Sequence, residues 1–113
     1  MEAGTFSQID VLAIAAHRDD VEQTCGGTLL RMAARQLRTG ILDLTQGESG
    51  TRGSAAERAA EAATAASILG VVHRQALDLP DGAVANTLEN RIKIASVLRE
   101  LRPRVVIDRK SVV

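Results

Sequence analysis

Short apolar runs recur along the chain, separated by longer stretches in which apolar residues are spaced as in a helix. The first run, Asp10–Ala16 (DVLAIAA), is continuous and ends in a polar cluster, which is typical of a buried strand. Runs of similar length follow three more times. The pattern therefore predicts four strands, at Asp10–Ala16, Ile41–Thr45, Ala76–Leu79 and Arg104–Ile107.

The first two gaps between these strands each predict a helix. After Gly26-Gly27, the segment TLLRMAARQLR keeps its apolar side chains at helical spacing, and Gly40 is the expected C-terminal stop. In the next gap an S-x-x-E capping box, Ser54 to Glu57, precedes an alanine-rich stretch. We expect this second helix to run over Ala55–Leu69 and to be closed by Gly70.

The third gap predicts a helix that ends near Leu101, because Pro103 blocks its continuation. Asn86 and Glu89 repeat the capping pattern at its start. The side chains expected on its apolar face are those of Ile92, Ala95, Leu98 and Leu101.

Strands and helices thus alternate, which predicts an α/β fold: a Rossmann-like three-layer sandwich with a mostly parallel sheet. The chain ends six residues after Ile107 without a helix to cover the fourth strand, so we expect the sheet to be truncated there. In open parallel sheets, sites lie beyond the carboxyl ends of the strands.

Composition narrows the function classes. The 113 residues carry 14 Lys+Arg and 14 Asp+Glu, a balance that argues against nucleic-acid or membrane binding. The presence of one aromatic residue, Phe6, argues against a base-stacking surface, and the single Cys25 suits a reducing compartment. With no apolar run long enough to span a membrane and no signal peptide, we expect a cytoplasmic domain.

The strongest chemical signal follows the first strand, in the segment AHRDDVE. His17 and Asp20 are three residues apart, so one turn could direct both at a single metal ion, while Asp19 would point elsewhere. A zinc hydrolase needs three protein ligands and an open position for water, so two ligands are too few. The alternative is a surface loop in which Asp19 or Asp20 caps the next helix.

Four other candidates have simpler explanations. We expect His73 to be an exposed loop residue at the amino end of the third strand, and Cys25 to be a small buried side chain. The glycine-rich loop Gly47–Ser54 fails the Walker pattern because no lysine precedes Ser54. Asp81, in a Pro-Asp-Gly turn, either faces the cleft or simply belongs to the turn.

Together these motifs resemble the PIG-L (LmbE-like) family of zinc-dependent N-deacetylases. The family's A-H-P-D-D-x-E and G-G-T-L segments match Ala16–Glu22 and Gly26–Leu29, with Arg18 in place of the usual proline. The chain is most similar to the bacillithiol-pathway branch, whose L-T-x-G-E-x-G-T-R-G-S and L-x-L-P-D-G segments match Leu44–Ser54 and Leu77–Gly82.

The resemblance implies roles for individual residues. His17 and Asp20 would be zinc ligands, Asp19 the base that activates the attacking water, and Arg58 a substrate-binding residue. The family's third ligand is a histidine just after the fourth strand, whereas this chain continues with DRKSVV. We therefore expect residues 1–107 to be the N-terminal part of a single deacetylase domain. Residues 108–113 are expected to be a non-native tail, because a common sequencing-library adapter would encode them.

The resemblance implies a zinc-dependent hydrolase that removes acetate from an N-acetylglucosaminyl conjugate, N-acetylglucosaminyl malate in the bacillithiol branch. We expect this fragment to be inactive without the third ligand. Its partner would be the small-molecule substrate, with no nucleic acid and no membrane, and a homo-oligomer is compatible with the full-length protein. The alternative is a noncatalytic carbohydrate- or nucleotide-binding module on a Rossmann-like sheet.

Overall fold

A computed structural model describes residues 8–17, 20–46, 54–80 and 84–108. Within them, four strands form one sheet in the order β3-β2-β1-β4, and every neighbouring pair is parallel. The strands are β1 (Val11–Ala15), β2 (Thr39–Asp43), β3 (His73–Ala76) and β4 (Val105–Asp108). The helices between them are α1 (Asp20–Ala34), α2 (Ala55–Leu69) and α3 (Leu88–Leu101).

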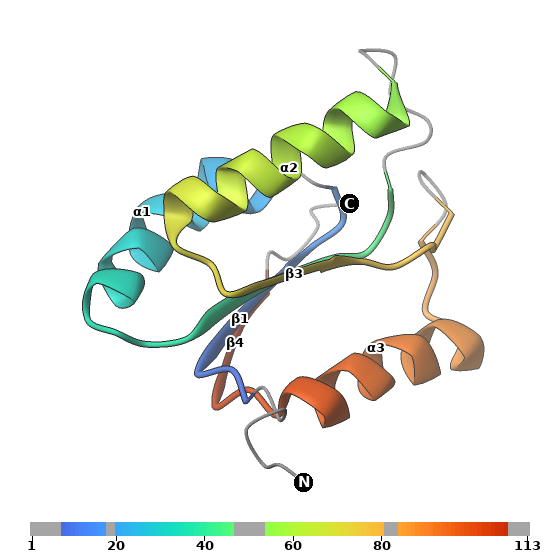
Figure 1. Cartoon of the computed structure of the whole chain (residues 1–113). Coiled ribbons are helices and arrows are strands. Elements are labelled where there is room, and N and C mark those ends of the chain that lie inside the picture. Colours follow the sequence, from blue (N-terminus) through green and yellow to red (C-terminus); the bar gives the residue numbers. More distant parts are fainter. Residues whose placement is uncertain (1–7, 18–19, 47–53, 81–83, 109–113) are drawn as a thin grey trace, which may run out of the picture.

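The helices cover the two faces of the sheet, with α1 and α2 on one side and α3 on the other (Figure 1). Side chains of β1 alternate between the two resulting cores, as the period of two in a strand requires. Val11, Ala13 and Ala15 pack with Val21 and Leu29 of α1 and Leu69 of α2. Leu12 and Ile14 pack with Val97 and Leu101 of α3. These layers confirm the predicted Rossmann-like α/β fold.

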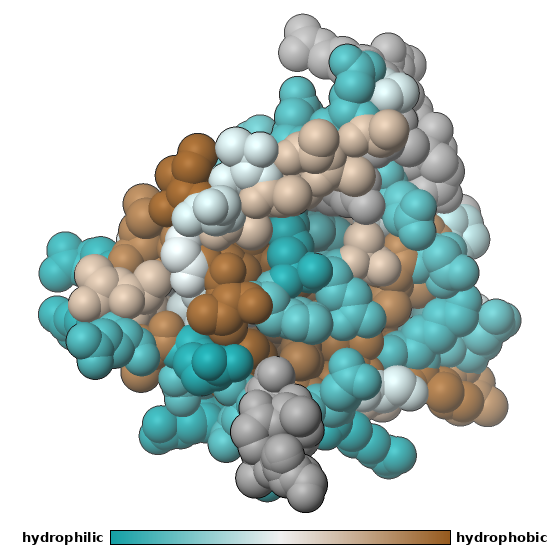
Figure 2. Space-filling model, in the orientation of Figure 1, coloured by the Kyte–Doolittle hydropathy of each residue, from teal (hydrophilic) through white to brown (hydrophobic). Residues whose placement is uncertain are grey.

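Helix α2 has the predicted bounds and both predicted ends. The Ser54 N–H donates to Glu57 Oε1 at 2.8 Å, and the Glu57 N–H donates to Ser54 Oγ at 3.1 Å, which completes the capping box. Gly70 ends the helix in the left-handed conformation, with φ of 72°. Between these ends α2 is rich in alanine, and Figure 2 shows residues of intermediate hydropathy, drawn in pale colours, over this helix.

The prediction for the first helix was wrong at both ends. Helix α1 begins at Asp20, six residues before Gly26, and its backbone leaves helical geometry at Cys25 (φ −139°, ψ 19°) before continuing. It ends at Ala34, and Gln36 rather than Gly40 takes the left-handed turn, with φ of 66°. Gly40 lies inside β2, where a Cβ would approach Leu12 Cδ1 to 3.2 Å.

Strand β3 lies three residues earlier than predicted, because pairing with β2 rather than hydropathy sets its position. Its register places His73 opposite Gly40 and Ala76 opposite Asp43. His73 lies at the amino end of β3 as expected, but the expectation of an exposed loop residue was wrong, because it is a partly buried strand residue. Its ring nitrogen Nε2 lies 3.1 Å from Gln75 Oε1. Strand β2 begins two residues earlier than predicted, and β4 one residue later.

Helix α3 ends at Leu101 as predicted but begins differently. Thr87, rather than Asn86, is the N-cap, and its Oγ1 accepts a hydrogen bond from the Asn90 N–H at 3.1 Å. Val97 and Leu101 are its buried residues, whereas Ile92 is 55% exposed. The buried face is thus narrower than the apolar spacing predicted.

Two other sequence-based expectations concern the chain as a whole. Among the described residues, no helix is long and apolar enough to cross a membrane. The expected non-native tail begins at Asp108, which pairs with Ile14 as the last residue of β4, while residues 109–113 lie outside the described residues.

The capping box generates a stability prediction. Ser54→Ala removes the acceptor for the Glu57 N–H and should lower the free energy of unfolding by about 1 kcal/mol. Urea unfolding followed by circular dichroism measures the change. Ser67→Ala, an exposed serine near the other end of α2, is the matched control and should cost nothing. Equal stability of the two variants would show that the capping box contributes nothing.

Candidate metal site at the carboxyl end of the central strand

The candidate site lies next to β1, where successive strands stop being added on one side of the sheet and continue on the other. After β1, the chain adds β2 and β3 on one side and then returns to place β4 on the other side of β1. In open α/β sheets this reversal creates a crevice beyond the carboxyl ends of the strands. His17 lies two residues beyond the end of β1 and Asp20 opens α1, so both lie at this edge.

The structure brings His17 and Asp20 together. The backbone N–H of His17 donates to Asp20 Oδ2 at 3.2 Å, and the imidazole Nδ1 lies 3.6 Å from the same oxygen. The Asp20 N–H in turn donates to the His17 carbonyl oxygen at 3.2 Å, which closes a tight turn. The side chains are 46% and 22% exposed, so both can be reached from solvent.

The geometry of this pair suits a shared zinc ion. Zinc bonds of about 2.0–2.1 Å in a tetrahedron separate two ligand atoms by about 3.3–3.4 Å. The observed 3.6 Å between Nδ1 and Oδ2 is close to that spacing. Imidazole nitrogen and carboxylate oxygen are also donors that zinc accepts. Within the described residues no group of three or more His, Cys, Asp or Glu side chains could hold a metal ion.

The other predicted site residues are only partly placed. Arg58 lies in the first turn of α2, where its side chain is partly buried. Because α2 follows β2, this turn begins at the same sheet edge as His17. Asp19, the predicted base, lies outside the described residues, as do Asp81 and residues 47–53 of the glycine-rich loop.

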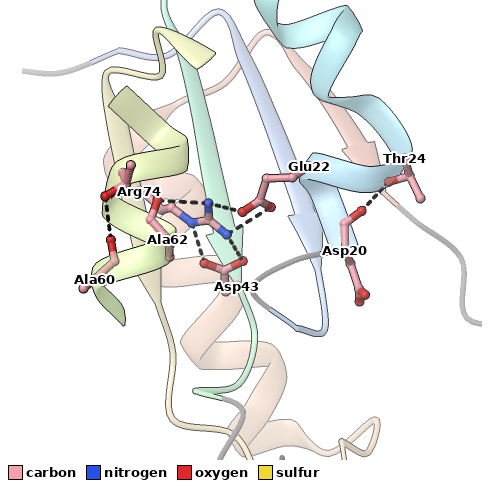
Figure 3. Close-up of polar contacts among 8 residues, drawn as sticks. Asp20, Glu22, Thr24, Asp43, Ala60, Ala62 and Arg74 are labelled. Atoms are coloured by element: carbon pink, nitrogen blue, oxygen red, sulfur yellow. Dashed lines mark hydrogen bonds and ion pairs between the residues drawn. The ribbon is translucent and has the colours of Figure 1, made fainter. Parts of the chain in front are cut away.

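Sequence analysis missed a buried ion cluster beside the candidate site. Arg74 of β3 donates through Nε and Nη2 to the two carboxylate oxygens of Asp43 at 2.9 and 3.0 Å. It also donates to Glu22 of α1, through Nη1 at 2.8 Å and Nη2 at 3.3 Å. Figure 3 shows Asp43 and Glu22 approaching the guanidinium from two different elements. We call these three residues the Arg74 cluster.

The partners of Arg74 in this cluster favour its charged form. Burial alone would lower the pKa of Arg74, but hydrogen bonds and charges from Asp43 and Glu22 outweigh burial and raise it above its ordinary value. Asp43 is 1% exposed and sits inside an otherwise apolar run. Carboxylates are almost never fully buried without a partner. An aspartate inside the apolar run ILDLT was therefore the feature of the sequence that could have predicted a buried cation beside it.

Cys25 behaves as expected, as a partly buried side chain packed against the core under α1. Burial raises the pKa of its thiol, a hydrogen bond with Thr24 opposes this effect, and the nearby Glu22 charge adds to it. The net pKa is raised, so the thiol is protonated at neutral pH. A protonated thiol is a poor nucleophile, which excludes Cys25 as an activated one.

Comparison with known proteins identifies the family of this chain. The model of the PIG-L family, described as GlcNAc-PI de-N-acetylase, matches residues 12–110. A diacetylchitobiose deacetylase from Thermococcus kodakarensis is 35% identical over 104 residues, which cover 86% of this chain and 39% of that protein.

Solved structures show the same fold. The conserved protein TT1542 from Thermus thermophilus superposes with a TM-score of 0.84 at 52% identity, over 88% of this chain and 45% of that one. The N,N'-diacetylchitobiose deacetylase from Pyrococcus horikoshii gives a TM-score of 0.80 at 28% identity, over 86% and 39%. The chain thus spans less than half the length of these relatives. Because the family match covers nearly all of its residues, the chain belongs to the PIG-L family.

Proposed function

We propose that this chain is part of a zinc-dependent hydrolase that removes acetate from an N-acetylglucosaminyl conjugate. The observation that carries the proposal is the His17–Asp20 pair, which lies at the carboxyl end of the central strand with its donor atoms 3.6 Å apart. Membership of the PIG-L family supports the reaction type. Catalytic zinc sites use three protein ligands, so the proposed site includes a third donor in addition to this pair.

The proposed roles follow from the chemistry of each side chain. His17 and Asp20 would hold the zinc ion, which when bound polarises a carbonyl and lowers the pKa of water to about 7. Asp19 would accept the proton of the attacking water as general base. Arg58 would bind a carboxylate or hydroxyl group of the substrate.

N-acetylglucosaminyl malate is the substrate that we propose within this class. The segments Leu44–Ser54 and Leu77–Gly82 resemble the bacillithiol branch of the family, and Arg58 offers a cation for a dicarboxylic acid. Two of the relatives are named diacetylchitobiose deacetylases, so a chitobiose substrate is the alternative that experiments need to separate.

The first prediction concerns the metal. His17→Ala should abolish stoichiometric zinc binding by a full-length form of the protein, because it removes one of the ligands. Isothermal titration with Zn²⁺ measures the loss. His73→Ala is the control. His73 lies at the amino end of β3, at the opposite edge of the sheet from His17, so this change should leave zinc binding unchanged. Absence of zinc binding by the unmodified protein would instead favour a noncatalytic binding module.

The second prediction concerns the base. Asp19→Asn keeps the proposed ligands but cannot accept a proton, so a full-length form should retain its zinc and lose about 100-fold or more in kcat. Acetate release from an N-acetylglucosaminyl substrate, measured alongside zinc content, tests both parts. Full activity of the Asn variant at neutral pH would rule out the role given to Asp19.

The third prediction concerns Arg58 and the substrate. Arg58→Ala should raise KM for N-acetylglucosaminyl malate more than it lowers kcat. The reason is that Arg58 would stabilise the bound substrate and the transition state equally, so its loss weakens substrate binding without slowing the chemical step. The increase should be smaller for diacetylchitobiose, which carries no carboxylate. Arg99→Ala, an exposed arginine of α3, is the control. An unchanged KM for both substrates would show that Arg58 does not bind the substrate.

A further inference from the structure

The segment that carries the candidate ligands is attached to the sheet at both of its ends. At the β1 end, the Ala16 carbonyl oxygen accepts hydrogen bonds from the Thr45 N–H at 3.0 Å and from Thr45 Oγ1 at 2.9 Å. Thr45 is fully buried, so this attachment is shielded from water. His17 follows directly after the attached carbonyl.

The second attachment lies on the other side of the ligands. Glu22 is in the first turn of α1, two residues after Asp20, and its carboxylate is hydrogen-bonded to Arg74 of β3. Side chains two apart on a helix do not face each other. Figure 3 accordingly shows Glu22 directed at the guanidinium and Asp20 directed away from it. Glu22 can therefore hold the first turn in place from a direction different from the one in which Asp20 points.

Arg74 is suited to this attachment because its own side chain is held by several partners. Its side chain is 9% exposed, and its forked guanidinium is bound to both oxygens of Asp43 at the end of β2. Nη1 also donates to the Ala62 carbonyl oxygen of α2 at 3.3 Å. One side chain thus links β3 with β2, α2 and the first turn of α1.

We propose that Glu22 is a positioning residue, which acts through the Arg74 cluster to hold the first turn of α1 where His17 and Asp20 can bind one metal ion. Groups that hydrogen-bond directly to metal ligands commonly contribute a factor of about 10–100 to metal affinity, and we expect Glu22, which acts through the turn, to contribute a factor of about 10. Glu22 is 23% exposed, whereas Asp43 is buried. Glu22 can therefore be neutralised without leaving an unpaired buried charge, since Arg74 and Asp43 still neutralise each other.

The test uses Glu22→Gln in the chain as given, with Glu100→Gln as the matched control. Glu100 is exposed on α3, on the opposite face of the sheet, and its change removes the same charge. In Glu22→Gln, backbone NMR order parameters over residues 20–24 should fall from about 0.85 to below about 0.6, while those of α3 stay unchanged. Zn²⁺ affinity should fall about tenfold.

A double-mutant cycle separates positioning from general destabilisation. Arg74→Lys keeps the charge that neutralises Asp43 but lacks the planar fork that spans two carboxylates. Once Arg74 is lysine, adding Glu22→Gln should therefore change zinc affinity little further. If Arg74→Lys does not fold, the comparison of Glu22→Gln with Glu100→Gln decides the question alone.

The outcomes are distinct. Unchanged order parameters in Glu22→Gln, or the same loss in Glu100→Gln, would overturn the inference. So would an unchanged zinc affinity when the unmodified chain binds zinc. The inference rests on the proposed function only through the zinc measurement. If the unmodified chain binds no zinc, the proposed function is weakened, while the metal-free order parameters still decide whether Glu22 holds the first turn.

Discussion

Complete burial of the central strand is the constraint on which the rest of this structure depends. Every residue of β1 is buried, and the strand is hydrogen-bonded to β2 on one side and β4 on the other. Its alternate side chains enter two separate cores, so both faces need a helical layer. A strand held on four sides cannot shift without breaking two ladders and two cores. His17, two residues after the end of the strand, therefore starts from a fixed point.

The Arg74 cluster extends this rigidity to residues that the apolar core does not hold. A buried carboxylate such as Asp43 is expensive unless a cation pairs with it, and Arg74 provides that cation from the neighbouring strand. Removing Arg74 would leave the Asp43 carboxylate in the interior without its cation. The packing around Arg74 and Asp43 therefore has to keep the two side chains together. Glu22, the third member of the Arg74 cluster, connects them to the start of α1.

The alanines of α2 make room for this arrangement. Ala59, Ala62 and Ala63 line a cavity of about 140 Å³ together with Arg74 and Asp43. Small side chains let the guanidinium lie beneath the helix and reach the Ala62 carbonyl oxygen. A larger side chain at the buried Ala62 would crowd the guanidinium. The alanine-rich composition of α2 therefore serves the electrostatics of the sheet as well as the formation of the helix.

The sequence alone determined the alternation of strands and helices, the bounds of α2 and the His17–Asp20 pair, because local signals carry each of them. Apolar runs mark β1, a capping box and a terminal glycine delimit α2, and a three-residue spacing brings His17 and Asp20 into one turn. Only the tertiary structure decided the position of β3 and the partners of Asp43. The strand His73–Ala76 (HRQA) contains no apolar run that would predict a strand. It is stabilised instead by pairing with β2 and by the ion pair between Arg74 and Asp43. Such contacts join residues 31 positions apart, which no local pattern encodes.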